Sequence, residues 1–209
     1  MNKTKYIDFV FEEILEKEDL DNLESTFLNL GFKKIYFVRE IKNKLDLEQD
    51  FIVPSTKSKY ITYEKAYLFY DISLLPKFRN QEKSIILGYG GNLKNNTDIL
   101  SKERGISILL NPLSDKLAFD TASSNLCKEN KIKVGFDLNY IRNKPLNSIK
   151  QLNFIISLLI KERIDLVIGS FARRKEELID PQIALSFLLN FGIEEQTLER
   201  FLGEGGEND

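Results

Sequence analysis

The stretch from Phe119 to Arg142 constrains the fold more than any other part of the chain. Its apolar residues first recur at helical spacing, which predicts an amphipathic helix over Phe119–Glu129. After Lys133 the period changes to two, which predicts a strand over Val134–Ile141. A helix that runs directly into a mostly apolar strand is half of a β–α–β unit, so we expect a parallel sheet.

The same alternation of strand and helix extends along the chain. The predicted strands are Tyr6–Phe11, Lys34–Arg39, Ala66–Ile72, Ser84–Leu87, Ile106–Leu110, Val134–Ile141 and Leu166–Ser170. The predicted helices run from Asp19 or Asp21 to Leu30, over Leu93–Lys102, over Phe119–Glu129, from Pro145 through Leu159, and from Asp180 to Asn190. The helix after Pro145 has an apolar stripe at Ile149–Leu159, which Phe154 and Leu158 widen. The glycine cluster at 88–92 lacks the spacing of a dinucleotide fingerprint, so it predicts a tight strand-to-helix turn.

Seven strands that alternate with helices predict an α/β fold, a TIM-barrel-like (β/α) barrel that is complete or lacks one strand. An eighth strand would lie at Phe51–Val53 or at Tyr60–Tyr63. The alternative is an open doubly wound sheet. We expect one domain over 1–203, whose last helix is Glu194–Leu202, and a disordered acidic tail over 204–209.

The composition is that of an ordinary globular protein, with 42% hydrophobic and 30% charged residues. Its one cysteine, Cys127, excludes a disulfide within the chain and lies on an apolar helix face, so core packing is favoured over a nucleophile. No apolar run is long enough to span a bilayer, and Met1–Lys5 does not open a signal peptide. We therefore expect a cytoplasmic protein that has no contact with membranes.

The sequence contains no histidine. This excludes metal sites built on His clusters, general acid–base catalysis by His, and Ser–His or Cys–His nucleophiles. An all-carboxylate magnesium site stays open, because Asp8, Asp71 and Asp137 lie in or at the ends of predicted strands. The alternative, which we favour, is that these acids pair with basic side chains or lie near the barrel rim.

Charge is unevenly distributed although the net charge is only −2. Residues 128–175 contain eleven Lys and Arg against four Asp and Glu, whereas residues 176–209 contain nine acids and one base. A basic middle between acidic ends can bind a polyanion with one face. The other interpretation is that these charges are solvated helix faces, and the pattern alone does not decide between the two.

Polar residues at the predicted strand ends are candidates for binding RNA. In a parallel barrel the carboxyl ends of the strands meet at one rim, and Arg, Asn and Ser donate hydrogen bonds to a sugar–phosphate backbone. The candidates are Arg39, Asn111, Asn139, Arg142, Ser170, Arg173 and Arg174, with Lys144 and Lys175 extending the patch. For each residue taken singly, a solvated surface role is an equal alternative.

The chain resembles the archaeal ribonuclease P protein component 3 family. The resemblance is carried by Phe119-Asp120, Leu126 and Phe136-Asp137-Leu138, and it continues through the helix after Pro145, the strand at 165–170 and Asp180-Pro181-Gln182. It implies a TIM-barrel-like fold related to metal-dependent phosphoesterases. It also implies a protein subunit that assists a catalytic RNA in removing the 5′ leader of precursor tRNA.

The resemblance further implies that the polypeptide has no catalytic residue and binds no cofactor, since Mg²⁺ acts through the RNA subunit. The implied partners are ribonuclease P RNA, protein component 2, other protein subunits and precursor tRNA. The competing hypothesis is a stand-alone metal-dependent phosphoesterase with Asp and Glu ligands. Metal-dependent hydrolysis of phosphoesters without RNA, abolished by Asp137→Ala, would distinguish this enzyme from the ribonuclease P subunit. The charge map predicts that Arg173→Ala with Arg174→Ala weakens RNA binding and flattens its salt dependence.

Overall fold

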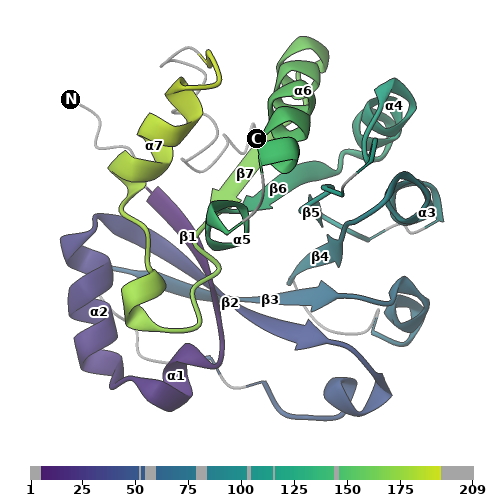
Figure 1. The fold of residues 1–209 in the computed structure, drawn as a ribbon. Helices are drawn as coiled ribbons and strands as arrows, with labels where there is room; N and C mark the ends of the chain where they lie inside the picture. Colours follow the sequence, from purple (N-terminus) through teal and green to yellow (C-terminus); the bar gives the residue numbers. More distant parts are fainter. Residues whose placement is uncertain are drawn as a thin grey trace, which may run out of the picture.

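The computed structural model describes residues 6–51, 53–54, 60–78, 84–102, 105–114, 116–143 and 146–193. Within this part of the chain, seven parallel strands form one sheet in the order in which they occur in the sequence (Figure 1). The strands are β1 (Tyr6–Phe11), β2 (Phe32–Ile41), β3 (Thr62–Phe69), β4 (Ile85–Tyr89), β5 (Ile108–Leu110), β6 (Lys133–Asp137) and β7 (Leu166–Gly169). The predicted parallel sheet is thereby confirmed.

The sheet curls into a nearly closed barrel, because the chain after β7 returns to β1. The backbone N–H of Phe171 donates to the carbonyl of Phe9 at 2.7 Å, and that of Phe11 donates to the carbonyl of Ala172 at 2.9 Å. Val10 and Ala172 form an isolated parallel bridge. These contacts join the first and last strands, so the alternative of an open doubly wound sheet is wrong.

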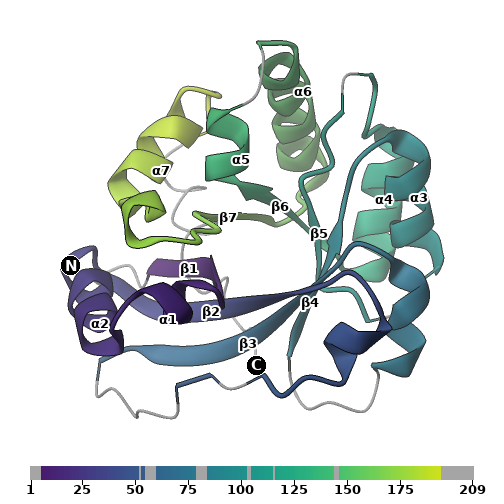
Figure 2. The same ribbon diagram turned by 60° about the horizontal axis from the view of Figure 1, so that its bottom comes forward.

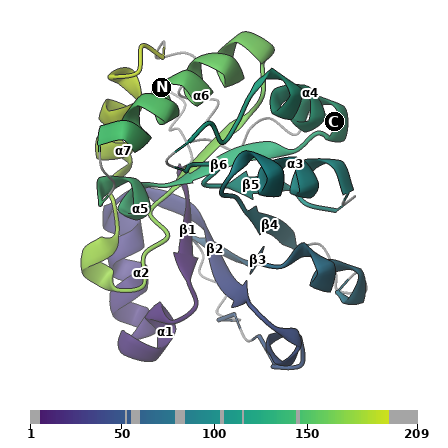
Figure 3. The same cartoon turned by 45° about the vertical axis from the view of Figure 1, so that its right-hand side comes forward.

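Helices surround the ring of strands (Figures 1 and 2). They are α1 (Ile14–Lys17), α2 (Leu20–Asn29), α3 (Leu93–Lys102), α4 (Thr121–Asn130), α5 (Leu138–Arg142), α6 (Leu146–Glu162) and α7 (Pro181–Leu189), with three 3₁₀ turns, η1 (Lys44–Leu47), η2 (Ile72–Lys77) and η3 (Lys175–Glu177). The five-residue helix α5 lies beside α7 (Figure 3). In the part of the chain that the structure describes, no helix has the length and apolar character that a membrane crossing requires.

The core has two layers, as the alternation of side chains along each strand requires. In β1, Phe9 and Phe11 belong to an inner cluster inside the barrel, whereas Val10 faces the outer cluster against the helices. The inner cluster consists of Phe9, Phe11, Tyr36, Val38, Ala66, Leu68, Leu87, Ile108, Leu110 and Phe171. Side chains thus fill the barrel interior, so a ligand on the barrel axis would lie above this layer, at one end of the barrel.

Close packing between the middle strands depends on glycine. A Cβ atom on Gly135 of β6 would lie 2.7 Å from Cγ2 of Ile108 in β5, and one on Gly90 would lie 2.8 Å from the carbonyl oxygen of Leu110. Gly90 also donates its backbone N–H to that carbonyl at 2.6 Å. The glycine cluster at 88–92 therefore joins β4 to α3 by a close turn, as predicted.

Most predicted elements are confirmed with shifts of a few residues at their ends. Asp19 accepts the N–H of Asn22 at the start of α2, and Asp180 precedes Pro181 at the start of α7. The strand predicted at Ala66–Ile72 is instead Thr62–Phe69, so the segment Tyr60–Tyr63 leads into β3 and is not an eighth strand. The predicted helix Glu194–Leu202, the acidic tail 204–209 and the helix start at Pro145 lie outside the described residues.

Two predictions are wrong in their details. The strand predicted to continue to Ile141 ends at Asp137, because the Asp137 carboxylate accepts the N–H of Tyr140 and so caps α5. The apolar stripe of α6 does not include Ile149 and Phe154, which are 39% and 50% exposed, whereas Leu152, Ile155, Ile156, Leu158 and Leu159 are buried. The error at the end of β6 arose because an alternating strand pattern does not show that the Asp137 carboxylate starts a helix.

Candidate functional site

The carboxyl ends of the strands surround a hollow of about 310 Å³, which we call the mouth of the barrel. Its lining comes from the ends of β1, β3, β4, β5 and β6, from α5 and from the chain after β7. The lining residues are Phe11, Leu68, Tyr70, Tyr89, Leu110, Asn111, Asp137, Asn139, Tyr140, Arg142, Asn143, Phe171, Arg173 and Glu177. In parallel barrels this end is where binding and catalytic groups gather.

Arg39, at the end of β2, is held by an extensive set of internal contacts. Its guanidinium donates to both carboxylate oxygens of Glu12 at 2.7–2.9 Å and to the carbonyls of Gln49 and Asp50 at 2.8 and 2.9 Å. The guanidinium carbon also lies 4.6 Å from the ring centre of Phe51. The Arg39 side chain is 11% exposed, so it fixes the segment after β2 and offers little to a ligand.

Arg173 is held in the same way across the closure between β7 and β1. Its guanidinium donates to Glu40 at 2.8 Å and to Glu13, and it lies 3.7 Å from the centre of the Phe11 ring. The Arg173 backbone N–H donates to Glu177 at 2.7 Å. Two carboxylates therefore balance the charge of this arginine where it lines the mouth.

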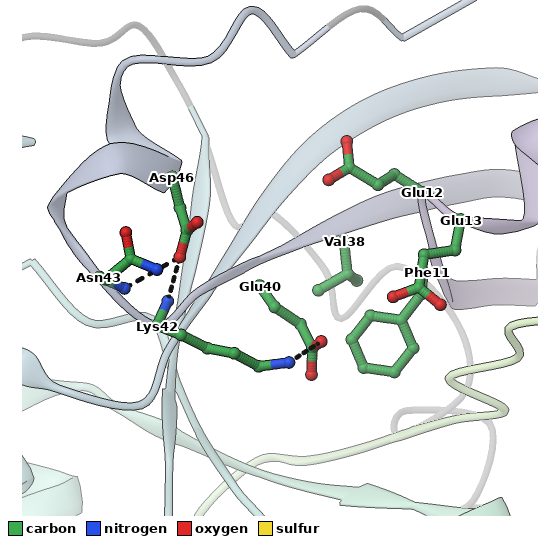
Figure 4. Close-up of a pocket in the computed structure, with 8 residues that line it drawn as sticks. All are labelled: Phe11, Glu12, Glu13, Val38, Glu40, Lys42, Asn43 and Asp46. Carbon is green, nitrogen blue, oxygen red and sulfur yellow. Dashed lines mark hydrogen bonds and ion pairs between the residues drawn. The ribbon is translucent and has the colours of Figure 1, made fainter.

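A second hollow, of about 190 Å³, adjoins the mouth at the ends of β1 and β2 (Figure 4). Its lining includes four carboxylates, those of Glu12, Glu13, Glu40 and Asp46. Lys42 pairs with Glu40 at 2.7 Å, and Asp46 accepts the backbone N–H groups of Lys42 and Asn43 at 2.7 and 2.9 Å. Each carboxylate thus has a basic or N–H partner. Among the described residues there is no group of three His, Cys, Asp or Glu that could hold a metal ion.

Tyrosine rings line the mouth where β3 and β4 end. Tyr70 follows β3 and Tyr89 ends β4, and their rings stack with centres 4.7 Å apart and planes at 30°. The Tyr70 hydroxyl donates to Glu40 at 2.5 Å. Burial, followed by the charge and hydrogen bond of Tyr140, raises the pKa of Tyr89. The hydroxyls thereby fix the orientation of the stacked pair.

Asparagines connect the strand ends beneath these rings. Asn111 is buried in a left-handed conformation, with φ of 51°, and its Oδ1 accepts the N–H of Asp137 at 2.9 Å. Asn139 donates from Nδ2 to the carbonyls of Ser170 and Glu177 at 2.7 and 2.8 Å. The Oδ1 of Asn139 is buried and has no hydrogen-bond partner within the described structure.

A buried aspartate lies in the closure between β1 and β7. Asp8 is 2% exposed, and its carboxylate accepts the N–H and the Oγ–H of Ser170, each at 2.6 Å, and the N–H of Phe9 at 2.9 Å. Burial raises the pKa of Asp8 to about 7. Burial also raises the pKa of Asp137 to about 7, and the negative charge of Asp8 adds to the effect.

The structure brings four of the nine candidate RNA-binding residues together in the mouth, namely Asn111, Asn139, Arg142 and Arg173. Ser170 is buried beneath it against Asp8, and Arg39 is held in its ion pair. Arg174 is exposed, and Lys175 donates to Asn22 at 2.7 Å on the side of α2. Lys144 lies outside the described residues. Whether any of these residues contacts RNA stays a prediction.

Of the three acids considered as metal ligands, Asp8 and Asp137 are close enough to influence each other, but Asp71 is separate. Asp71 is exposed and accepts the N–H of Ser73 at 2.9 Å at the start of η2. The residues that the sequence did not single out are Tyr70, Tyr89 and Tyr140 in the mouth and, beside it, the carboxylates that balance the arginines. Their position at strand ends was the available signal, but a tyrosine that follows an apolar strand is also typical of core packing.

Comparison with known proteins identifies the fold. No protein-family model and no curated protein matches the sequence. The fold is similar to histidinol phosphate phosphatase from Lactococcus lactis, with a TM-score of 0.63 and 7% identity over 91% of this chain and 95% of that chain. It is also similar to an amidohydrolase, with a TM-score of 0.54 and 8% identity over 94% of this chain and 71% of that chain. The chain thus has the TIM-barrel-like fold of these phosphatases and amidohydrolases, as predicted.

A chain from the cryo-EM structure of archaeal ribonuclease P with mature tRNA has a higher TM-score, 0.72. The identity is 17%, and the match covers 92% of this chain and 85% of that chain. The fold that the component 3 resemblance implies is therefore present over nearly the whole length of this chain.

Proposed function

We propose that this chain is a protein subunit of ribonuclease P that assists a catalytic RNA in removing the 5′ leader of precursor tRNA. The observation that carries the proposal is the similarity of its fold to a chain of archaeal ribonuclease P over 92% of its length, with a TM-score of 0.72. The phosphatase and amidohydrolase neighbours cover similar lengths at lower TM-scores, 0.63 and 0.54. The component 3 resemblance points to the same assembly.

The chemistry of the mouth supports binding in preference to hydrolysis by the polypeptide. The phosphatase neighbour was solved with zinc, which proteins bind mainly through His, Cys and carboxylate groups. This sequence has no histidine, and its one cysteine is buried in the core. The carboxylates beside the mouth are already paired with Arg39, Arg173 and Lys42.

In this proposal the polypeptide binds RNA and stabilises its active conformation, and Mg²⁺ acts through the RNA. Arg142 and Arg174 are exposed at the carboxyl end of the barrel, where guanidinium groups can donate to phosphate oxygens. RNA recognition would depend on backbone and shape, since structured RNA is read largely through those features. The other partners would be protein component 2, further protein subunits and precursor tRNA, in the cytoplasm.

The test is to purify the tagged protein from its own cells and to sequence the RNA and protein that accompany it. The preparation is then incubated with precursor tRNA and Mg²⁺, with nuclease-treated material as the control. We expect a structured RNA, companion proteins and release of the 5′ leader that nuclease treatment abolishes. Recovery of the protein alone, with phosphoester hydrolysis that survives nuclease and is lost in Asp137→Ala, would instead identify a stand-alone phosphoesterase.

A further inference from the structure

The aromatic side of the mouth is a surface of fixed rings. Tyr70 and Tyr89 stack at 4.7 Å, the Tyr70 hydroxyl is bonded to Glu40, and the Tyr89 hydroxyl is linked to Tyr140. Tyr70 is nevertheless 38% exposed. Rings that are already oriented lose little conformational freedom when a planar ligand stacks on them. This combination of fixed orientation and exposure favours an aromatic ligand.

The dimensions of the hollow limit that ligand to one small planar group. Its volume of about 310 Å³ is at the lower end of the range for small-molecule sites, roughly 300–1,000 Å³. Leu68, Leu110 and Phe171 line it and also belong to the packed interior of the barrel, so they form an apolar floor. A single nucleobase fits these dimensions, whereas a double helix does not.

The charges around the hollow favour a neutral group inside and an anion at the rim. Arg173 is balanced by Glu13 and Glu40, and Asp137 also lines the hollow. A phosphate inside would therefore meet little net positive charge. Arg142 of α5 lines the hollow but is exposed, so its guanidinium is available to a phosphate that stays in water.

We propose that the mouth of the barrel binds one unpaired nucleotide, with its base against Tyr70, Tyr89 and Tyr140 and its phosphate at Arg142. Unpaired bases in RNA are commonly bound by stacking on aromatic side chains. The same chemistry would accept a free nucleotide. The inference rests on the proposed function only for the source of the nucleotide, which would then be an unpaired position of the RNA.

The binding test uses the tyrosines as reporters, because the chain has eight tyrosines and no tryptophan. Protein with isotope-labelled tyrosine rings is titrated by NMR with adenosine 5′-monophosphate and, separately, with a short single-stranded oligoadenylate RNA. We expect both to shift the ring signals of Tyr70, Tyr89 and Tyr140. Tyr60 is the internal control, since it is 57% exposed and precedes β3 at the opposite end of the strands. Unshifted mouth tyrosines, or equal shifts at Tyr60, would overturn the proposal.

Variants separate stacking from a general loss of structure. Tyr70→Ala should weaken binding of adenosine 5′-monophosphate by at least about fivefold, because base–aromatic stacking is lost. Tyr70→Phe keeps the ring and should change binding by less than about twofold, and Tyr60→Ala is the matched control with unchanged binding. Equal losses in Tyr70→Ala and Tyr70→Phe would refute stacking as the cause.

Arg142→Gln tests the phosphate contact. It should weaken binding of adenosine 5′-monophosphate but leave binding of adenosine unchanged, because only the monophosphate carries the anion. Equal weakening of both ligands would contradict a phosphate at Arg142. The Tyr70 and Arg142 variants are purified separately and compared by the same titration.

The two proposals fail in distinguishable ways. If the purified protein carries ribonuclease P RNA but neither probe shifts the mouth tyrosines, the nucleotide site is wrong and the proposed function stands. If both probes bind in the mouth but no such RNA accompanies the protein, the site stands with free nucleotide as its ligand and the proposed function fails. Binding of the oligoadenylate much more tightly than the monophosphate would identify RNA as the source.

Discussion

Two groups of residues, on two sides of the carboxyl end of the barrel, use polar side chains in different ways. On the acid–arginine side, comprising Glu12, Glu13, Arg39, Glu40 and Arg173, each charge is paired with another charge of the same chain. On the tyrosine–asparagine side, comprising Tyr70, Tyr89, Asn111, Asn139 and Tyr140, the polar atoms bond to the backbone, to one another and, at Tyr70, to Glu40, while ring surface of Tyr70 stays exposed.

This difference shows why a map of basic residues is not a map of a binding surface. Arg39 and Arg173 are arginines at strand ends, as a phosphate-binding rim would require, yet both act within the protein. Arg142 and Arg174 are equally close to strand ends but exposed. The internal carboxylates, which lie far from their arginines in the sequence, decide which guanidinium groups remain available.

The largest effect is expected from breaking the acid–arginine side. Arg39→Ala should lower the free energy of unfolding by about 2–3 kcal/mol, because Glu12 would lose its partner in a partly buried site and the Gln49 and Asp50 carbonyls would lose their donors. Urea unfolding followed by circular dichroism measures this change. The matched control is Lys44→Ala, whose exposed pair with Glu48 at 4.0 Å should contribute less than about 0.5 kcal/mol. Equal effects would mean that the Arg39 pair is no more stabilising than a surface pair.

The buried Asp8 beneath both sides should make stability depend on pH. Because burial raises the pKa of Asp8 from 3.8 to about 7, the folded state retains a proton that the unfolded state releases between these values. The free energy of unfolding should therefore fall as the pH rises from about 4 to about 7, by at most about 1.4 kcal/mol per pH unit for this group, and level off above. Asp8→Asn should flatten the slope, because an amide does not titrate in this range, and its oxygen can still accept from Ser170 and Phe9.

Urea unfolding at a series of pH values measures that slope. Asp137 contributes in the same direction, so part of the slope should persist in Asp8→Asn. Asp71→Asn is the control, because the Asp71 carboxylate accepts hydrogen bonds from Ser73 that lower its pKa, so its contribution has the opposite sign. A pH profile that Asp8→Asn leaves unchanged would show that Asp8 is ionised throughout this range.

The fold was largely predictable because its signals are local. Strand periodicity, helix caps such as Asp19 and Asp180 and the turn at Gly90 depend on neighbouring residues, and the structure has them where the sequence indicates. Closure of the barrel by Phe171 and Ala172 was not predictable in detail. It depends on a contact between the first strand and the segment after the last, which no local pattern encodes.

The site was less predictable because it depends on pairing between distant residues. Asn111, Asn139, Arg142 and Arg173 were expected at one rim, and they line one hollow. The ion pair of Arg173 with Glu13 joins residues 160 positions apart, so the sequence could not indicate that this arginine is already paired. Tyr89 was overlooked for the same reason, since only its stacking on Tyr70 distinguishes it from a core tyrosine.

A smaller effect is expected on the tyrosine–asparagine side. Tyr89→Phe removes the hydroxyl that is linked to Tyr140, and it should lower the free energy of unfolding by about 0.5–1.5 kcal/mol. A double-mutant cycle with Tyr140→Phe measures the coupling, which should account for most of the loss. Additive losses would show that the two hydroxyls do not stabilise each other and that ring packing alone holds this side.

The smallest effect on stability is expected at Arg174, where the two arginines after β7 can be compared directly. Arg174→Ala should change the free energy of unfolding by less than about 0.5 kcal/mol, because the side chain is exposed. Arg173→Ala should destabilise the protein more, because Glu13 and Glu40 would lose their shared partner.

In RNA-binding titrations over a series of salt concentrations, Arg174→Ala should reduce the log–log salt slope by about 1, as expected for one phosphate contact. An unchanged slope in Arg174→Ala would remove this residue from the RNA-binding surface, and a reduced slope in Arg173→Ala alone would mean that its ion pairs open when RNA binds.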